Sequence, residues 1–589
     1  MSRSFILCAV VVCLLAAGPT AAQFPAAPGD VTVFTARKIV TMDPGWPEAT
    51  AVAVQDGRIL SVGTLNDLQP WLRRFPHTVD RRFEQNVIYP GFVEPHSHPL
   101  IGGTSLTRPP LTFFPTPNPW GPAFPGVKDK AAAFAKLADY VAADPSDEVL
   151  VSWGYDVVAM GGYIDKAELD AVSATKPILV WDASEHFVFG NSAAIRKLGL
   201  TPALAKEVPG IGLSVDGALN GQFLGERAAQ AVLLKPLQGL LDPRVARRNM
   251  KYLSDLAQQA GVTTMSDLAF GLVDIPLEAA LLRAAFDDPS ASQRAVVVVN
   301  GESFSAAYGA NMIAEAQKLA QASTERLMFR GVKFFSDDAF LSLGMEITDP
   351  GYVHPDRYRG LFMFDSFKDF VAGMTPWWNA GFHIHVHTNG NAGNQATIDA
   401  LAALQAQKPR FDHRFTLEHY GISTPEQARQ VKALGAVVSI NPYYLYARGD
   451  LTGPEIGNDR AFTAARLRTL VDEGVVVSLH TDTPVAPPRP LEEVWIAVNR
   501  IGAISGEVLG PAERVPVEKA IRMVTIDAAY TLGVEDKVGS IRAGKLADFV
   551  VLGDDPQTVA PAAIRDVPVI ATVLGGRVIA TESTRMPPK

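Results

Sequence analysis

Cysteine is nearly absent: the 589 residues include only Cys8 and Cys13, and both lie in a segment with the pattern of a signal peptide. This segment has a basic start, a short apolar run over residues 5–17 and small residues at a cleavage site, 20–22. We therefore expect residues 1–22 to be removed and the protein to be exported, to the periplasm or outside the cell. The mature chain then has no disulfide and no thiolate, so any metal ligands must come from His, Asp, Glu or a modified Lys.

Other features that define whole classes of protein are also missing. No later apolar run is long enough to anchor the chain in a membrane. Neither cysteine sits at the cleavage point, which argues against a lipid anchor. The net charge is -9 and there is no basic stripe, so binding to nucleic acid is not expected. A small-molecule substrate is the expected partner, and a homo-oligomer is left open.

Short β-strands are predicted at both ends of the mature chain, over residues 30–87 and 539–585. In the first stretch β-branched residues cluster or alternate, and the Asp-Gly pair at 56–57 is typical of a hairpin turn. The second stretch has the same character, with a Gly-Gly turn at 575–576. Two such segments around a long middle part predict one small β-sandwich built from both ends.

The middle of the chain, residues 88–538, alternates helix-like and strand-like stretches. Four times a helical stretch ends in glycine, which permits the left-handed conformation that stops a helix, and an apolar strand follows at once. This alternation predicts an α/β fold, a (β/α)8 TIM barrel, whose active site lies at the carboxyl ends of the strands. The eight predicted strands fall near residues 86–94, 261–267, 295–300, 331–337, 381–387, 414–419, 435–441 and 474–480.

A long segment, residues 99–260, separates the first predicted strand from the second and far exceeds an ordinary loop between strand and helix. Because this insertion starts directly after the first strand, we expect it to lie over the mouth of the barrel and to form much of the substrate pocket. Its aromatic residues favour a substrate with an apolar or aromatic part, although each could equally well belong to the core of the insertion. The candidate substrate-binding residues are Trp153, Tyr155 and His186.

The first predicted strand runs into a His-x-His motif, His96 and His98. In an extended chain these two side chains point to the same side, as two ligands of one metal ion must, and imidazole is a common ligand of zinc. An isolated His-x-His is more often two unrelated histidines, but here other strands also end in polar residues. The polar residues at these strand ends are His96, His98, Lys333, His387, His419, His480 and Asp482. Four of the histidines, from the first, fifth and sixth strands, together with Asp482 could surround one or two ions of zinc or a similar divalent metal.

Not every polar residue near these strand ends is expected to bind metal. His383 and His385 share a face with His387 but should lie lower in the barrel, and His480 could support the ligands from behind. Glu418 alternates with His419 along its strand and is expected to point away, in a structural role.

Lys333 is predicted to be buried, and a buried ammonium ion is costly. Reaction with CO2 would convert the amine into a carbamate, an anionic ligand that can bridge two metal ions. The alternative is an unmodified lysine paired with Asp337 or Asp338, and the sequence leaves both open.

Asp482 follows the last predicted strand in a Thr-Asp-Thr-Pro turn. Beside a metal-activated water it could act as general base and then pass the proton to the leaving group. The alternative role, capping the next helix, is less consistent with a turn that directly follows an apolar strand.

Taken jointly, several motifs resemble the metal-dependent amidohydrolase superfamily. Within it the chain is most similar to the family-3 amidohydrolases, a group with a long insertion after the first strand that includes N-substituted formamide deformylases. The resemblance runs from about residue 30 to residue 579. Its markers are Pro90-Gly-Phe-Val-Glu-Pro-His96-Ser-His98-Pro, Asn191-Ser192 after His186, Gly261-Val-Thr-Thr, Gly331-Val-Lys333-Phe-Phe-Ser-Asp337, His387 before Gly390, Glu418-His419, Thr481-Asp482-Thr-Pro-Val485 and Gly539-Ser-Ile-Arg-Ala-Gly544-Lys-Leu-Ala-Asp548.

The resemblance implies the barrel with its β-sandwich and a particular assignment of ligands. It implies one metal position at His96, His98 and Asp482, and a second at His387 and His419. It further implies that Lys333 is the carboxylated bridge, that Asp482 doubles as general base, and that His186 lies near the substrate.

The sequence departs from the family pattern at two places on the rim. Gly390-Asn391 stands where the family usually has Gly-Asp, and Asp337-Asp338 stands where it usually has Asp-Gly. Neither change removes an expected ligand, but both weaken any transfer of substrate specificity.

The expected activity is metal-dependent hydrolysis of a C–N bond in an amide, formamide or cyclic amide. Ester or carbamate hydrolysis and a non-hydrolytic lyase or isomerase reaction are alternatives on the same site, because a barrel does not determine its reaction. An inactive binding protein of the same fold is a third alternative, and the presence of all six expected site residues argues against it.

Overall fold

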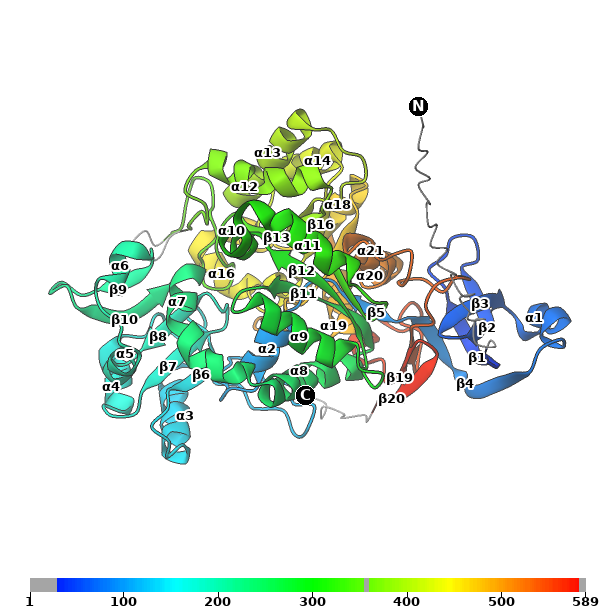
Figure 1. The fold of residues 1–589 in the computed structure, drawn as a ribbon, viewed down its shortest axis with the longest axis horizontal. Helices are drawn as coiled ribbons and strands as arrows, with labels where there is room; N and C mark the ends of the chain where they lie inside the picture. Colours follow the sequence, from blue (N-terminus) through cyan, green and yellow to red (C-terminus); the bar gives the residue numbers. More distant parts are fainter. Residues whose placement is uncertain (1–28, 354–359, 582–589) are drawn as a thin grey trace, which may run out of the picture.

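The chain is described by a computed structural model over residues 29–353 and 360–581, and the predicted signal peptide lies outside these ranges. Figure 1 shows three parts: a sheet built from both ends of the chain, a central barrel, and the insertion on the far side of the barrel from that sheet. Within the described ranges, no helix combines the length and the apolar character needed to cross a membrane.

The central part is a nearly closed barrel of eight parallel strands, as predicted. Strand order in the sheet follows chain order, and each strand pairs in parallel with the next. Two of the strands have only three residues, so the register at the mouth depends on contacts beyond the strands themselves. The strands are β5 (Phe92–Glu94), β11 (Val262–Phe270), β12 (Arg294–Asn300), β13 (Leu327–Phe335), β14 (Ile384–Thr388), β15 (Thr416–His419), β16 (Val437–Ile440) and β17 (Val477–Leu479).

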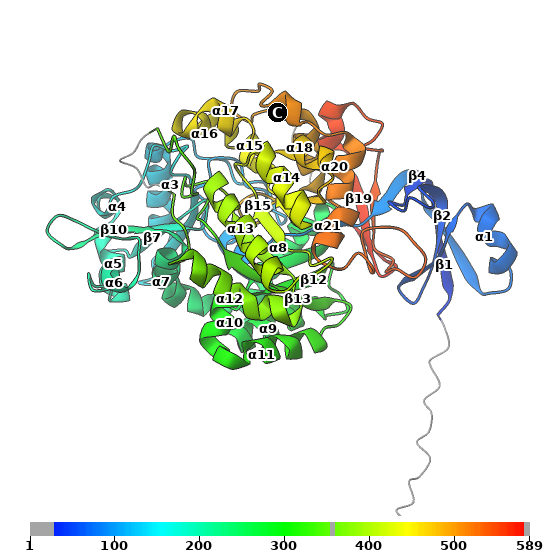
Figure 2. The same ribbon diagram turned by 90° about the horizontal axis from the view of Figure 1, so that it is seen from above.

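Helices cover the outside of the barrel (Figures 1 and 2). The four glycines predicted to stop helices, Gly261, Gly381, Gly435 and Gly474, all have positive φ angles, between 73° and 90°. The helices of this part are α8 (Pro243–Gln259), α9 (Ile275–Phe286), α10 (Gly301–Tyr308), α11 (Met312–Gln321), α12 (Phe367–Ala380), α13 (Asn391–Gln407), α14 (Pro425–Leu434), α15 (Tyr443–Tyr446), α16 (Gly449–Ile456), α17 (Asn458–Ala461), α18 (Leu467–Asp472), α19 (Pro490–Asn499), α20 (Val517–Met523) and α21 (Ile526–Thr531).

Both ends of the chain join in one β unit, as expected, and all its strands belong to a single hydrogen-bonded sheet. The long strand β4 pairs with β1 from the N-terminal part and with β18 from the C-terminal part. Because β4 ends at Pro90 and β5 begins at Phe92, this sheet leads directly into the first strand of the barrel. In sheet order the strands are β20 (Arg577–Ala580), β19 (Val569–Leu574), β18 (Phe549–Leu552), β4 (His77–Pro90), β1 (Val31–Val40), β2 (Glu48–Gln55) and β3 (Arg58–Gly63), followed in the chain by helix α1 (Leu65–Leu72).

The insertion between β5 and β11 has its own five-stranded sheet and its own core. The buried residues of helix α7 (Glu226–Leu237), and some of those on the insertion's strands, instead belong to the main core of the barrel. The insertion therefore reaches back to the barrel through α7 and through its sheet. Its other elements are α2 (Pro99–Leu106), α3 (Lys130–Ala143), β6 (Leu150–Tyr155), α4 (Lys166–Val172), β7 (Ile178–Asp182), β8 (Phe187–Gly190), α5 (Ser192–Leu198), α6 (Leu204–Glu207), β9 (Ile211–Leu213) and β10 (Leu219–Leu224).

A buried ion pair joins the terminal sheet to the barrel. Arg294, the first residue of β12, donates from Nε and Nη2 to the two carboxylate oxygens of Asp548, at 2.6 and 3.0 Å. Both side chains are at most 5% exposed, and the backbone N–H of Gly575 donates to the same carboxylate at 2.8 Å. Loss of the carboxylate would leave a guanidinium buried without its partner.

We predict that Asp548→Ala lowers the free energy of unfolding by about 3–5 kcal/mol, because one half of a buried ion pair is then unpaired. Thermal and urea unfolding measure the change. The control is Asp554→Ala, which removes an exposed partner of Arg37 and should cost less than about 1 kcal/mol. Equal effects of the two substitutions would contradict the assigned role of Asp548.

Candidate active site

The mouth of the barrel is closed by hydrogen bonds between the ends of its first and last strands. The backbone N–H of Asp482 donates to the carbonyl of His96 at 3.1 Å, and the N–H of His98 donates to the carbonyl of Thr483 at 3.1 Å. The side chain and N–H of Thr481 both donate to the buried carboxylate of Glu94. These contacts bring the His-x-His motif and Asp482, 384 residues apart in the chain, to one place.

The side chains of His96, His98 and Asp482 converge at this point. The distance from Asp482 Oδ1 is 3.1 Å to His98 Nε2 and 3.4 Å to His96 Nε2. One nitrogen or oxygen atom from each of the three residues lies within 4.8 Å of the others, which is the spacing that a shared metal ion requires. The three residues expected to share one metal position are therefore brought together.

The carboxylate of Glu418 holds His96 from behind. His96 Nδ1 lies 2.7 Å from Oε2 of Glu418, and His385 Nδ1 lies 2.6 Å from its Oε1. All three side chains are buried. Because the carboxylate can only accept, each of these Nδ1 atoms carries a proton, and Nε2 of His96 keeps its lone pair toward the convergent cluster. A carboxylate in this position is a common way to fix the tautomer and orientation of a ligating histidine.

The inward position of Glu418 differs from the expectation that it points away, and the backbone explains why. His419 has a φ angle of 71°, in the left-handed region that a non-glycine residue rarely adopts. This conformation breaks the alternation of side chains at the end of β15, so that Glu418 and His419 both reach the interior. The strict alternation assumed from the sequence hid the role of Glu418.

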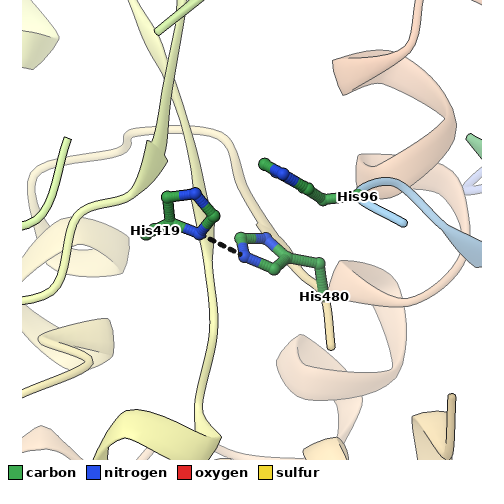
Figure 3. Close-up of side chains that lie close together, drawn as sticks. All are labelled: His96, His419 and His480. Atoms are coloured by element: carbon green, nitrogen blue, oxygen red, sulfur yellow. Dashed lines mark hydrogen bonds between the residues drawn. The ribbon is translucent and has the colours of Figure 1, made fainter. Parts of the chain in front are cut away.

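A second group, His96, His419 and His480, shares His96 with the first (Figure 3). His419 Nδ1 is 3.0 Å from His480 Nε2, and His480 Nδ1 is 2.7 Å from the hydroxyl oxygen of Ser439. If both Nδ1 atoms carry the proton, this chain of donors leaves Nε2 of His419 with a free lone pair. That Nε2 atom is buried and has no hydrogen-bond partner. One donor atom each of His96, His419 and His480 also lies within 4.8 Å of the others.

The other expected ligands lie beside this cluster. The ring of His387 is centred 4.5 Å from that of His419, but its Nε2 accepts a hydrogen bond from Asn389 Nδ2 at 2.9 Å. Lys333 is buried on β13, with Nζ 3.2 Å from His96 Nε2. Asp337, which the sequence offered as an ion-pair partner for this lysine, instead accepts hydrogen bonds from the backbone N–H groups of Asn389 and Gly390.

The electrostatics of the cluster keep His96 and His419 neutral and Asp482 ionised, whereas the carboxylate of Asp482 raises the pKa of His98 against the effect of burial. Burial and neighbouring positive charges hold the pKa of His96 and His419 well below the usual value, which is the neutral form that binds metal. Burial opposes ionisation of Asp482, but the hydrogen bond and charge of His98 outweigh it and lower its pKa to about 2. Burial also lowers the pKa of the Lys333 amine, and nearby carboxylates only partly offset this effect.

The cluster lines a cavity of about 140 Å³. His186 is part of its wall, and its Nδ1 makes a hydrogen bond to Asp338. Burial opposes protonation of His186, but the charge of Asp338 outweighs it and raises the pKa of His186 to about 9. His186 thus lies beside the cluster as an imidazolium.

The two aromatic candidates lie elsewhere. Trp153 lines a separate cavity of about 220 Å³, on the other side of the loop that follows Asp482. Tyr155 is fully buried in the core of the insertion, and its hydroxyl donates to the carbonyl of Gly162 at 2.9 Å. The insertion covers the site mainly through α7 and through the turn that contains His186, not through these aromatic residues.

The donor set fits a metal ion such as zinc. It combines neutral imidazole nitrogens with a carboxylate, and sulfur ligands are absent from the described site. Two buried imidazole nitrogens in the site, Nδ1 of His98 and Nε2 of His419, have no hydrogen-bond partner. Such groups are costly to bury unless something else satisfies them, and a metal ion would do so for Nε2 of His419.

A parallel barrel with a histidine and aspartate cluster at the carboxyl ends of its strands defines a metal-dependent hydrolase. The chain belongs to the amidohydrolase family, whose model matches residues 84–580. The expected family is thus confirmed, and the protein is a metal-dependent amidohydrolase, an enzyme.

Individual relatives are distant but match over nearly the whole chain. Protein LONG AFTER FAR-RED 3 of Arabidopsis thaliana is 24% identical over 546 residues, covering 92% of this chain and 90% of that protein. N-substituted formamide deformylase of Arthrobacter pascens is 24% identical over 551 residues, covering 90% and 94%. Among solved structures, an uncharacterized metal-dependent hydrolase from Pyrococcus horikoshii OT3 has a TM-score of 0.67 at 17% identity, covering 90% of this chain and 99% of the other. This last likeness shows the shared fold.

We predict that Glu418→Gln weakens metal binding by about 10- to 100-fold, because the amide no longer fixes the tautomer and orientation of His96. Competition with a chelator of known affinity measures the change. The control is Glu426→Gln, which alters an exposed carboxylate on α14 and should leave metal affinity unchanged. Unchanged affinity in Glu418→Gln would show that His96 is oriented by other contacts.

Proposed function

We propose that this enzyme hydrolyses the C–N bond of an amide, a formamide or a cyclic amide. The observation that carries the proposal is the convergence of His96, His98 and Asp482 at the closed mouth of the barrel, in the wall of a cavity. These three residues would hold one ion of zinc or a similar divalent metal. His387, His419 and Lys333 would hold a second.

Asp482 has the properties that a general base at this position needs. Its carboxylate is buried, is held by His98, and has a pKa that keeps it ionised at neutral pH. A bound metal would supply acidity to a water molecule and polarise the substrate carbonyl. Asp482 would then take the proton and deliver it to the leaving nitrogen.

Lys333 has the properties that carboxylation requires. The reaction needs a neutral amine, because the nitrogen lone pair attacks CO2 and one proton is released as the carbamate forms. Burial lowers the pKa of this amine and so favours the neutral form. The carbamate oxygens would reach beyond Nζ, which already lies 3.2 Å from His96 Nε2, toward both proposed metal positions.

His186 would orient the substrate. As an imidazolium held by Asp338 in the cavity wall, it can donate a charge-assisted hydrogen bond to a substrate oxygen. Asp338 is one of the two rim positions at which the sequence departs from the family pattern. The pair therefore offers a reason for a substrate that differs from those of relatives.

We predict that Asp482→Ala lowers kcat by about 10²- to 10⁴-fold on any amide that the wild type hydrolyses, because the general base is lost. Kinetics with saturating zinc, together with metal analysis, measure the effect. The control is Asp472→Ala, which removes an exposed carboxylate on α18. Unchanged turnover in Asp482→Ala would exclude the proposed mechanism.

We predict that Lys333→Ala reduces the metal content of the purified protein from about two ions per chain to about one or fewer, because the bridging ligand is lost. Elemental analysis measures the content, and added acetate or propionate should restore part of it by supplying a carboxylate. The control is Lys318→Ala, on the exposed face of α11. A single ion per chain in both wild type and Lys333→Ala would contradict the carbamate bridge.

A further inference from the structure

One helix of the insertion lines the cavity above the cluster with a row of residues that is polar at one end and apolar at the other. Helix α7 faces it with a single stripe of residues, spaced three and four apart, which is the repeat of one helix face. The stripe extends about 16 Å along the helix axis. Its members are Glu226, Ala229, Gln230, Leu233, Leu234 and Leu237, and Leu241 follows in the next turn.

The polarity of this stripe changes from one end to the other. Glu226, at the start of α7, interacts electrostatically with His186 and Lys333, so the polar end faces the reacting centre. Gln230 donates to the Glu226 carboxylate at 2.8 Å. From Leu233 onward every residue of the stripe is a leucine. Leu234 is 37% exposed, which places the far end of the cavity at the solvent.

The opposite walls of the cavity repeat this aliphatic character. They come from α2, directly after the His-x-His motif, from the end of β11 and the loop after it, and from the loop after Asp482. Aromatic side chains are few on these walls: within the described residues, Trp181 and Phe335 are the ones other than the histidines. The aliphatic residues that complete the lining are Leu100, Ile101, Leu268, Leu272, Val273 and Val485.

The aromatic side chains of this region line the second cavity instead. Its walls include Phe113, Phe114, Trp153, Tyr443 and Tyr444. Val485, on the loop after Asp482, lines both cavities. The second cavity thus has more aromatic side chains in its walls than the cavity that the cluster lines.

We propose that the substrate carries an unbranched aliphatic chain that lies along the leucines of α7. Its amide group would then lie at the cluster of His96, His98 and Asp482. The inference rests on the proposed function, which it makes more specific. An alkyl chain gains from contact with leucine side chains along its whole length, and the exposed end at Leu234 lets a longer chain extend into solvent. The aliphatic lining favours an alkyl chain over an aromatic ring.

Binding of alkyl hydroxamates to the zinc-loaded protein tests this inference without requiring turnover. Calorimetry compares butanohydroxamate, octanohydroxamate and benzohydroxamate, whose head groups are the same. We predict that octanohydroxamate binds about tenfold or more tightly than butanohydroxamate, because four more methylenes are buried. We also expect it to bind more tightly than benzohydroxamate.

Two substitutions on α7 test whether the alkyl chain of the ligand lies along this helix. Leu237→Trp should narrow the far end of the cavity and reduce the preference for eight over four carbons to about threefold or less. Leu234→Gln, at an exposed position that tolerates a polar group, should weaken octanohydroxamate while leaving butanohydroxamate within about twofold. The control is Lys235→Trp, on the same helix but outside the cavity lining, which should change neither affinity.

The inference is overturned if affinity does not rise with chain length, if benzohydroxamate binds most tightly, if no hydroxamate binds, or if the α7 variants behave like Lys235→Trp. A panel of amides, assayed for release of the amine, separates this failure from failure of the proposed function. If the enzyme hydrolyses amides but prefers aryl substrates, only the inference of an aliphatic substrate chain is overturned. Chain-dependent binding of hydroxamates without turnover of any amide would overturn amide hydrolysis alone.

Discussion

The active site depends on the closure of the barrel at its mouth. β5 and β17 are the two ends of an eight-stranded sheet and have only three residues each, so their own ladders contribute little to their alignment. The backbone hydrogen bonds that join His96 to Asp482 and His98 to Thr483 align them instead. If these bonds were lost, the two histidines would separate from the carboxylate, and neither element alone could hold a metal ion.

Burial of the cluster makes it favour a bound cation. The cluster contains several ionisable groups with little access to water, where an unpaired charge or polar group is costly. Glu418 satisfies Nδ1 of both His96 and His385, and Ser439 ends the chain that runs through His480 and His419. With Nδ1 of His96 and of His419 satisfied in this way, their Nε2 lone pairs face the cluster, which favours a bound cation.

In the proposed enzyme, catalysis and substrate recognition reside in different parts of the chain. The barrel supplies the cluster, whereas helix α7 of the insertion supplies a row of leucines in the wall of the cavity. A change in the leucines of α7 could alter the substrate without disturbing a single candidate ligand. This separation explains how one barrel can serve many reactions and substrates, and it is consistent with relatives that share only 24% identity over most of the chain.

The sequence by itself determined the barrel, the sheet shared by both chain ends, and the residues of the cluster. These are local properties: glycine stops a helix, an apolar run forms a strand, and His-x-His at a strand end points to one side. Tertiary structure decided what depends on distant contacts or on unusual backbone. The left-handed φ of His419 brought its side chain to the same side as Glu418, against the alternation that the sequence implied. The folding of the insertion placed Tyr155 in its core, Trp153 at a second cavity and the leucines of α7 above the cluster, because a pattern of apolar residues does not specify which surface will cover them.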